Sequence, residues 1–415
     1  GNAAMRKYLF PAILLITITT ISQPRPPAAT LPPIEPGVPL ELAKWRAAHY
    51  SDVRYKLNLT LEKMSPVLKG TMEIRLVVRD AVTTGRGDAG IAGQPTTGTQ
   101  ASPPASAQGA EIPPIILDWR KIRGHEEKST ISNVTINGRK VQSASFSSSI
   151  REEPLAAGGV RDESRTLNFA EHNEHLIFCE GVVPGENVIT LDFTSPILTS
   201  GSAITRYVDK EDGSEYIYSL FVPSDASTAF PVFDQPDLKA RFTLSVKSPR
   251  NWTVVSNGSP SSGGIPNDKN RGSHTFIETQ PISKYVFAFS AGEFAHFSEV
   301  SDKDAFTELG MVAVTVTDLY QKMGTHIYVR KSQAEKFKRH VAEVFRLNRE
   351  AIKYFEEYFD YNFPFPKYDL VLIPEFPFGG MEHAGATFLR ESAIIFPQEP
   401  TRNDHISRAL LIFHE

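Results

Sequence analysis

Cysteine occurs only once in the 415 residues, at Cys179. A single thiol excludes an internal disulfide framework and any zinc site built from cysteines. Because Cys179 follows the apolar run Leu176-Ile177-Phe178, we expect it to be a small buried hydrophobic residue. The 40% hydrophobic and 10% aromatic content is enough for hydrophobic cores.

Excess charge of either sign is also lacking, since the formal net charge is −4. A nucleic-acid-binding protein would need a basic face, so we expect no nucleic-acid partner. The length of 415 residues exceeds one ordinary domain and favours two domains with tails.

Long apolar runs are scarce, and the clearest one follows the basic start Met5-Arg6-Lys7 and extends from Leu9 to Ile21. It is short for a bilayer span and contains Pro11, so residues 1–21 resemble a secretory signal peptide. No small-x-small cleavage site follows, and an uncleaved anchor stays open as the alternative. We expect a secreted or periplasmic protein, in contact with a membrane only if this segment is retained. Residues 22–39 are rich in proline and are expected to be a linker.

The next part of the chain has the pattern of β-strands. Apolar and polar residues alternate over Val53–Leu61 and Met72–Val78, and Asn137-Gly138 is a strong hairpin signal. We expect residues 40–292 to form an antiparallel β domain of sandwich or saddle type. Residues 83–114, composed largely of small residues, glycine and proline, are expected to be a disordered insertion.

Helical periodicity begins after this region. Apolar residues recur every three to four positions over Lys331–Phe359, and Tyr368–Ile373 is a compact apolar strand. Asp404 can cap a last helix, with Ile406, Ala409, Leu410 and Phe413 on one face. The fold class expected is α+β multidomain, with a mixed α/β domain over residues 293–415.

The last two residues, His414-Glu415, match the opening of the zinc motif His-Glu-x-x-His. Residues four apart share one helical face, so both histidines of such a motif can bind zinc, and the glutamate can deprotonate a water. The dipeptide alone is a weak signal, because His125-Glu126 has Ser129 where the second histidine would fall. Its alternative interpretation is a helix-end pair that faces solvent.

Two longer motifs give these residues a context. The segment Phe363–Pro374, followed by Gly379-Gly380-Met381-Glu382-His383-Ala384-Gly385, resembles the aminopeptidase N family of zinc peptidases. In that family a Gly-Ala-Met-Glu-Asn loop precedes the zinc helix by about this interval. Phe233–Thr243 is similar to a second hallmark of the family, and the resemblance covers roughly Tyr50 to Glu415.

The resemblance implies a zinc-dependent aminopeptidase that releases N-terminal residues from peptides, with a thermolysin-like catalytic domain starting near residue 293. It implies that Glu382 binds the free α-amine of the substrate and that Gly379 and Gly380 let the peptide backbone approach. Met381 belongs to the same substrate loop and is expected to pack.

For the metal, the resemblance implies one Zn²⁺ per complete protein, with His414 as the first ligand and Glu415 as general base. The other ligands and an oxyanion-stabilising tyrosine are then expected after Glu415. The 415-residue chain is accordingly expected to be truncated within the motif and inactive by itself.

Three departures from the family pattern affect the expected substrate. His383 replaces asparagine, and Gly380 replaces alanine, as it does in relatives that include leukotriene hydrolase. Val222 stands where many relatives have an acidic or amide residue directed at the amine. The amine pocket is expected to depend mainly on Glu382, with help from Asp225 or Gln235 left open.

Two other functions stay open. A non-catalytic family member could act as a peptide-binding or scaffold protein, and a hydrolase of the leukotriene hydrolase branch could act on another small substrate. Two weaker motifs are the metal-capable Glu171–His175 segment and the N-glycosylation pattern at Asn257-Gly258-Ser259.

Overall fold

The computed structural model describes residues 31–79, 112–144, 167–261, 272–298 and 325–415. The expected signal peptide or anchor over 1–21 lies outside these residues, as does the expected insertion up to residue 111. Within residues 31–39, which belong to the expected linker, Ile34 contacts the core of the sheet that follows. The Ile34 side chain is 7% exposed within the core, and the Asn173 amide donates to the Ile34 carbonyl at 2.7 Å.

The helices and strands of the described residues are, in chain order, α1 (Leu40–His49), β1 (Tyr50–Thr60), β2 (Val67–Val78), β3 (Ile115–Asp118), β4 (Thr130–Ile136), β5 (Arg139–Ala144), β6 (Leu167–His172), β7 (His175–Phe178), β8 (Gly185–Pro196), β9 (Ile204–Val208), β10 (Glu215–Ser219), β11 (Ala240–Lys247), β12 (Thr253–Ser256), β13 (Ser273–Phe276), β14 (Phe289–Gly292), β15 (Phe294–Ser298), β16 (His326–Arg330), α2 (Ala334–Phe337), α3 (Val341–Phe359), β17 (Asp369–Ile373), β18 (Gly380–Met381), β19 (Ala386–Arg390), α4 (Glu391–Ile394) and α5 (Arg402–His414).

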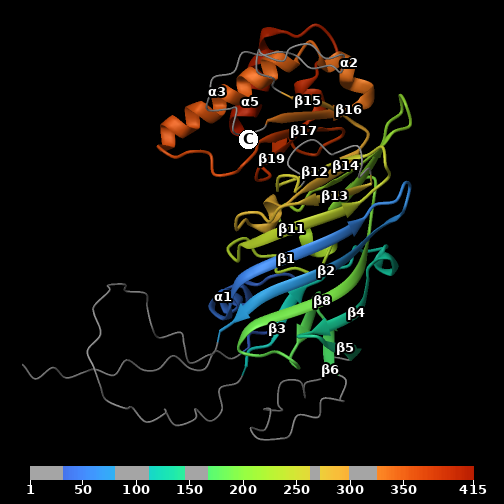
Figure 1. The fold of residues 1–415 in the computed structure, drawn as a ribbon, viewed down its shortest axis with the longest axis vertical. Coiled ribbons are helices and arrows are strands. Elements are labelled where there is room, and N and C mark those ends of the chain that lie inside the picture. Colours follow the sequence, from blue (N-terminus) through green and yellow to red (C-terminus); the bar gives the residue numbers. More distant parts are fainter. Residues whose placement is uncertain (1–30, 80–111, 145–166, 262–271, 299–324) are drawn as a thin grey trace, which may run out of the picture. The chain divides into compact units, whose positions relative to one another are not determined.

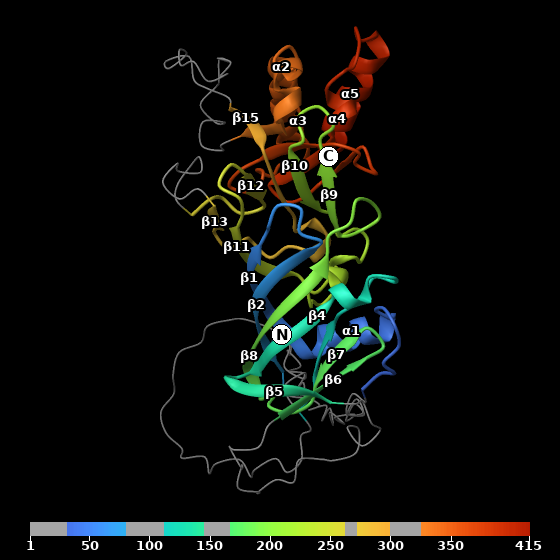
Figure 2. The ribbon, with the colours of Figure 1, turned by 90° about the vertical axis from the view of Figure 1, so that its right-hand side faces the viewer.

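The first sheet has ten strands among the described residues, in the order β13-β11-β1-β2-β8-β4-β5-β6-β7-β3. Figures 1 and 2 show β11, β1, β2, β8 and β4 side by side. The sheet is mixed, because β1 pairs parallel with β11 and β5 pairs parallel with β6. The expectation of a purely antiparallel domain is therefore corrected. Parallel neighbours need a long crossover, and local hairpin signals such as Asn137-Gly138 carry no information about such pairings.

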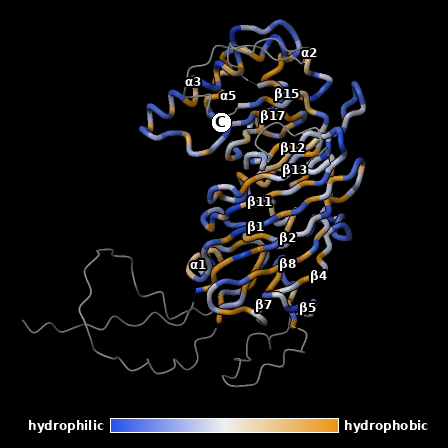
Figure 3. The backbone as a smooth tube through the Cα atoms, in the orientation of Figure 1, coloured by the Kyte–Doolittle hydropathy of each residue, from blue (hydrophilic) through white to orange (hydrophobic). Residues whose placement is uncertain are grey.

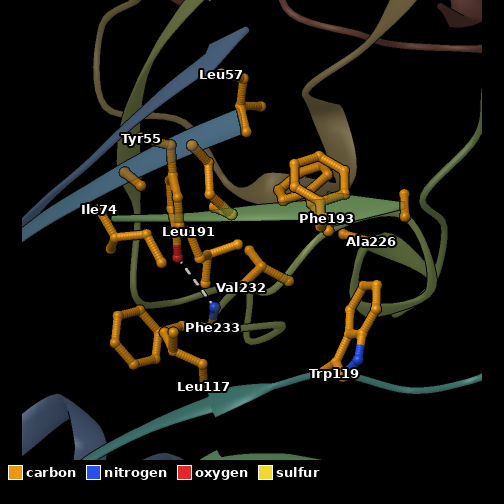
Figure 4. Close-up of a cluster of buried hydrophobic side chains, with 14 of the residues drawn as sticks. Tyr55, Leu57, Ile74, Leu117, Trp119, Leu191, Phe193, Ala226, Val232 and Phe233 are labelled. Atoms are coloured by element: carbon orange, nitrogen blue, oxygen red, sulfur yellow. Dashed lines mark hydrogen bonds between the residues drawn. The ribbon is translucent and has the colours of Figure 1, made fainter. Parts of the chain in front are cut away.

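The core of this sheet follows from the alternation of side chains along its strands. Val53, Tyr55, Leu57 and Leu59 are each at most 2% exposed, and the residues between them lie towards solvent. Figure 3 shows hydrophobic and hydrophilic residues alternating along β1. In the close-up of Figure 4, the Phe233 N–H donates to the Tyr55 hydroxyl at 2.9 Å. This bond attaches the start of the Phe233–Thr243 motif to the core.

Two smaller sheets complete the described part of the chain, with orders β12-β14-β10-β9 and β15-β16-β17-β19-β18. The third sheet is buried on both faces. Leu370 and Leu372 of β17 pack with Val344 of α3, whereas Val371 and Ile373 belong to a cluster with residues of the second sheet. Side chains of successive residues point to opposite faces, so β17 lies between α3 on one face and the second sheet on the other.

The helical region differs from the single helix expected over Lys331–Phe359. It is a 3₁₀ turn over Lys331–Gln333, then α2, and then α3 after a break at residues 338–340. α3 ends at Phe359 and is followed by Asp360 in a left-handed conformation with φ 49°. No helix among the described residues is both long enough and apolar enough to cross a membrane.

The last helix, α5, also differs from expectation. Thr401 is the N-cap, and Asp404 is the third residue of the helix and completes a capping box. Ile406 and Leu410, expected on the buried face, are 45% and 67% exposed. The helix instead buries Arg408 and Ile412.

The Glu171–His175 segment forms the β6–β7 hairpin. Its turn residues Asn173 and Glu174 both have positive φ, as the tight connection requires. The His175 ring is fully buried, lies 2.8 Å from the Asp118 carboxylate and contacts the Glu35 carbonyl at 2.8 Å. His175 is thus a structural residue of the β domain.

Candidate functional site

The loop around Glu382 begins as a hairpin at the edge of the third sheet, where β18 pairs antiparallel with β19. The Arg390 N–H donates to the Gly379 carbonyl at 2.7 Å. The Arg390 guanidinium donates to the carbonyls of Phe376 at 3.0 Å and Pro377 at 2.9 Å. The start of the loop is fixed by backbone pairing and by one arginine.

Burial alternates along the loop, and this alternation directs Glu382 to solvent. Met381 is 5% exposed and His383 is 1% exposed, whereas Glu382 between them is exposed. Met381 packs in a cluster with Tyr218 and Phe388, as its expected packing role requires. The two buried side chains anchor the backbone on either side of a free carboxylate, which is available to bind an ammonium group.

His383 is a buried neutral residue of this loop. Its ring lies edge-on to Phe388, with the ring centroids 4.5 Å apart. Neither ring nitrogen has a hydrogen-bond partner among the described residues, and burial lowers the pKa of His383 to about 3. The histidine therefore fills space in the loop and carries no charge at neutral pH.

The end of the loop is held by a buried lysine. The Lys367 ammonium, 5% exposed, donates to the Asp369 carboxylate at 2.7 Å and to the Gly385 carbonyl at 2.9 Å. Neither Lys367 nor Arg390 was expected to contribute to the site. Their partners at the loop are backbone carbonyls, and no residue pattern in the sequence marks such contacts.

The last turn of α5 packs against the two glycines of the loop. A Cβ atom at Gly379 would lie 3.0 Å from Leu411 Cδ1, and one at Gly380 would lie 2.7 Å from Glu415 Cγ. The helix end can approach this closely because neither position has a side chain. The structure thereby brings Glu415 of one expected motif against Gly380 of the other, although 35 positions separate them in the sequence.

The electrostatics of this contact concern two carboxylates. The pKa of Glu415 is raised from 4.5 to about 7, chiefly by partial burial and also by the negative charge of Glu382, with His414 opposing the shift. A carboxyl group with this pKa can accept and return a proton near neutral pH, as a general base requires. His414 itself is exposed at the end of α5.

Val222 presents an apolar side chain beside the loop. It is partly buried and packs against the cluster that contains Met381 and Tyr218. Asp225 and Gln235, the two residues left open as further partners of the substrate amine, form other contacts. Asp225 pairs with the Arg120 guanidinium, and the Gln235 amide donates to the Ala43 carbonyl at 2.8 Å.

Whether the residues present can hold a metal ion depends on how many ligand side chains lie together. Within the part of the chain that the structure describes, no group of three or more histidine, cysteine, aspartate or glutamate side chains is placed to hold a metal. His414, beside Glu415 at the end of α5, contributes one donor. These residues alone do not make a zinc centre.

Comparisons with known proteins identify the family of this sequence. The profile of the peptidase M1 N-terminal domain matches residues 121–286, and that of the peptidase family M1 domain matches residues 344–415. Aminopeptidase N of Streptomyces lividans is 35% identical over 250 residues, which are 60% of this chain and 26% of that protein.

More distant relatives show the same partial coverage. A probable aminopeptidase 1 of Sulfurisphaera tokodaii is 30% identical over 67% of this chain and 31% of its own length. The human glutamyl aminopeptidase is 27% identical over 56% of this chain and 22% of its own length. The matched part of the chain thus spans about a fifth to a third of the length of these relatives.

The two family profiles occur in chain order and together cover more than half of the sequence. The Glu382 loop and α5 both lie within the second match. The chain belongs to the M1 family of peptidases, the aminopeptidase N family, with its N-terminal domain and the beginning of its catalytic domain. This family is zinc-dependent.

Proposed function

We propose that this chain carries the amine-binding loop and the start of the zinc helix of an aminopeptidase that releases N-terminal amino acids from peptides. The observation that supports this proposal best is the contact of Glu415 with Gly380, which directly precedes Met381-Glu382. It places a carboxyl group with a pKa of about 7 beside a loop that exposes a second carboxylate.

In the proposed function the two carboxylates have different tasks. Glu382 pairs with the ammonium group of the substrate, and an internal peptide bond has no such charge, so only the terminal residue is positioned for cleavage. Glu415 takes a proton from the attacking water and returns it to the leaving amine. Zinc, with His414 as one ligand, would supply Lewis-acid polarisation of the scissile carbonyl.

The architecture proposed for the whole protein follows the family. Residues 40–292 would be its β domain of sandwich or saddle type, and residues 293–415 would begin a thermolysin-like catalytic domain. A polypeptide of these 415 residues should be inactive by itself, because among the described residues only His414 is placed as a zinc ligand by the motif.

We also propose export. The basic start Met5-Arg6-Lys7 and the apolar run to Ile21 support a signal peptide and a secreted or periplasmic location. N-terminal sequencing of the protein from its native compartment tests this. A mature chain that begins after Ile21 is expected, and a chain that keeps Met5 to Ile21 in a membrane fraction would favour the anchor.

The function is tested by comparing two substrates of the complete protein. An aminoacyl anilide with a free amine should be hydrolysed, and its N-acetylated form should not, because acetylation removes the charge that Glu382 binds. Equal turnover of both would contradict amine anchoring, and turnover of neither would favour the non-catalytic alternative. The coding sequence should also place histidine at the third position after Glu415 and a glutamate about twenty residues later.

A further inference from the structure

The corner that follows β12 contains a buried asparagine whose amide is used in full. The Asn257 side chain is 4% exposed. Its Nδ2 donates to the carbonyls of Val286 at 2.8 Å and Ala384 at 2.9 Å, and its Oδ1 accepts from the Ala288 N–H at 2.7 Å. Although Asn257-Gly258-Ser259 matches the N-glycosylation pattern, this amide is buried and bonded within the fold.

One of these three hydrogen bonds joins the β-rich part of the chain, residues 40–292, to the amine-binding loop. Ala384, whose carbonyl accepts it, is the second residue after Glu382. The Ala384 N–H donates in turn to the Val286 carbonyl at 3.3 Å. The two backbone polar groups of Ala384 are therefore bound by two residues from the β-rich part of the chain, the carbonyl by Asn257 and the N–H by Val286.

The neighbouring glycine shows how closely the two segments approach. Gly385 has φ +73°, and a Cβ atom there would lie 3.1 Å from the Asn257 carbonyl oxygen and 3.2 Å from that of Lys367. The chain can turn here because glycine adopts positive φ without strain. The backbone after Glu382 is thus enclosed between Asn257 and Lys367.

We propose that Asn257 is a positioning residue for the amine-binding loop: by holding the Ala384 carbonyl it sets where the Glu382 carboxylate stands relative to the substrate. This inference rests on the proposed function, to which it adds a role for the β-rich part of the chain. Loss of the amide would leave the Ala384 carbonyl without this buried donor, and the loop would move to find another partner. A shift of about 1 Å in a positioned group can cost on the order of a hundredfold in catalytic efficiency.

The test compares two buried asparagines in the complete protein. Asn187 is fully buried and, like Asn257, binds three backbone groups, with Nδ2 donating to the Val183 and Gly185 carbonyls and Oδ1 accepting from the Val183 N–H. It belongs to β8 of the first sheet. The variants N257D and N187D keep the shape and the acceptor of the side chain but remove its donors.

Both variants are expected to lower the melting temperature. N257D alone should raise KM for a free-amine substrate roughly tenfold or more with kcat nearly unchanged, because substrate binding is lost equally from the ground state and the transition state. N257A should act in the same direction. Wild-type KM in N257D, or an equal rise in N187D, would overturn the proposal.

Hydrogen exchange separates failure of this inference from failure of the proposed function. If the wild-type protein hydrolyses no free-amine substrate, the proposed function fails, and the positioning role is then decided on the 415-residue chain. The amides of His383, Ala384 and Ala386, which are bonded within or behind the loop, should exchange faster in N257D than in N187D. Equal exchange in the two variants would overturn the positioning role as well.

Discussion

At Gly380 the absence of a side chain decides which groups can meet. The Glu415 carboxyl occupies the space that a Cβ atom would fill, so the end of α5 rests directly on the loop. Partial burial of Glu415 and the negative charge of Glu382 together raise the pKa of Glu415 to about 7. A side chain at position 380 would collide with Glu415 as it stands here, so the contact requires glycine at this position.

Val222 is the residue at which the amine pocket can be strengthened. It packs in the cluster that contains Met381, so a carboxylate at this position would stand beside the loop of Glu382. In the complete protein V222E should lower KM for aminoacyl substrates several-fold, because the ammonium group gains a second charged partner. V222T, which is similar in shape to valine but uncharged, is the control. An unchanged KM in V222E would contradict this account of the pocket.

His383 should make the fold sensitive to acid. Burial lowers its pKa from 6.5 to about 3, so between these values the unfolded chain binds a proton that the folded chain excludes. The free energy of unfolding therefore falls as the pH drops below about 6.5, and the penalty is fully absent above that value. Replacing the ring by phenylalanine removes this contribution.

Urea unfolding of the 415-residue chain measures the effect. Relative to wild type, H383F should be about 1 kcal/mol more stable at about pH 5.5 than at about pH 7.5. The difference between variant and wild type is the quantity to follow, because burial also lowers the pKa of His296 to about 4. The same substitution at exposed His405 is the control. A stability difference that is independent of pH would show that His383 binds a proton equally well in the folded and the unfolded chain.

At the scale of elements, α5 is important because its last turn carries His414 and leads to Glu415. Its beginning is fixed by a capping box in which the Thr401 hydroxyl accepts from the Asp404 N–H at 3.3 Å and the Asp404 carboxylate accepts from the Thr401 N–H at 2.7 Å. Burial of Ile412 attaches its other end to the third sheet.

The cap gives a direct prediction for this helix. T401A should lower the free energy of unfolding by about 1 kcal/mol, because it leaves one backbone N–H of the first turn without its partner. T401S, which keeps the hydroxyl, should retain most of the wild-type stability. Urea unfolding of the three chains decides the matter, and equal stability of T401A and wild type would mean that the cap contributes nothing.

The sequence predicted the strands that alternate, such as β1 and β2, because burial on one face leaves a period of two. It predicted the Glu382 loop and His414-Glu415 through family resemblance. It did not predict the parallel pairing of β1 with β11, because such a pairing depends on packing between residues 187 positions apart in the sequence. The break between α2 and α3 was missed because the apolar period continues across it.

The same limit applies to the residues that support the loop. Asn257, Lys367 and Arg390 all act on backbone carbonyls, and a carbonyl has no identity in the sequence. Polar residues of this kind become visible only when the fold shows that they are buried and which groups they bind.

At the scale of the whole described molecule, the third sheet is joined to the β-rich part by packing and by charge. Arg330 of β16 donates to the Asp209 carboxylate at 2.5 Å, beyond the end of β9, and to Glu391 of α4 at 2.6 Å. All three side chains are largely buried, so each charge needs the others. With the Asn257 contact, this network makes the β-rich part a support for the candidate site.

Glu382 is proposed to bind the substrate amine, and KM of E382Q in the complete protein measures this role most directly. The amide keeps the size of the side chain but loses the charge-assisted hydrogen bond, which contributes about 2 kcal/mol, so KM for a free-amine substrate should rise roughly 30-fold. The control is E357Q, at an exposed glutamate of α3, which should keep the wild-type KM. A wild-type KM in E382Q would contradict the account.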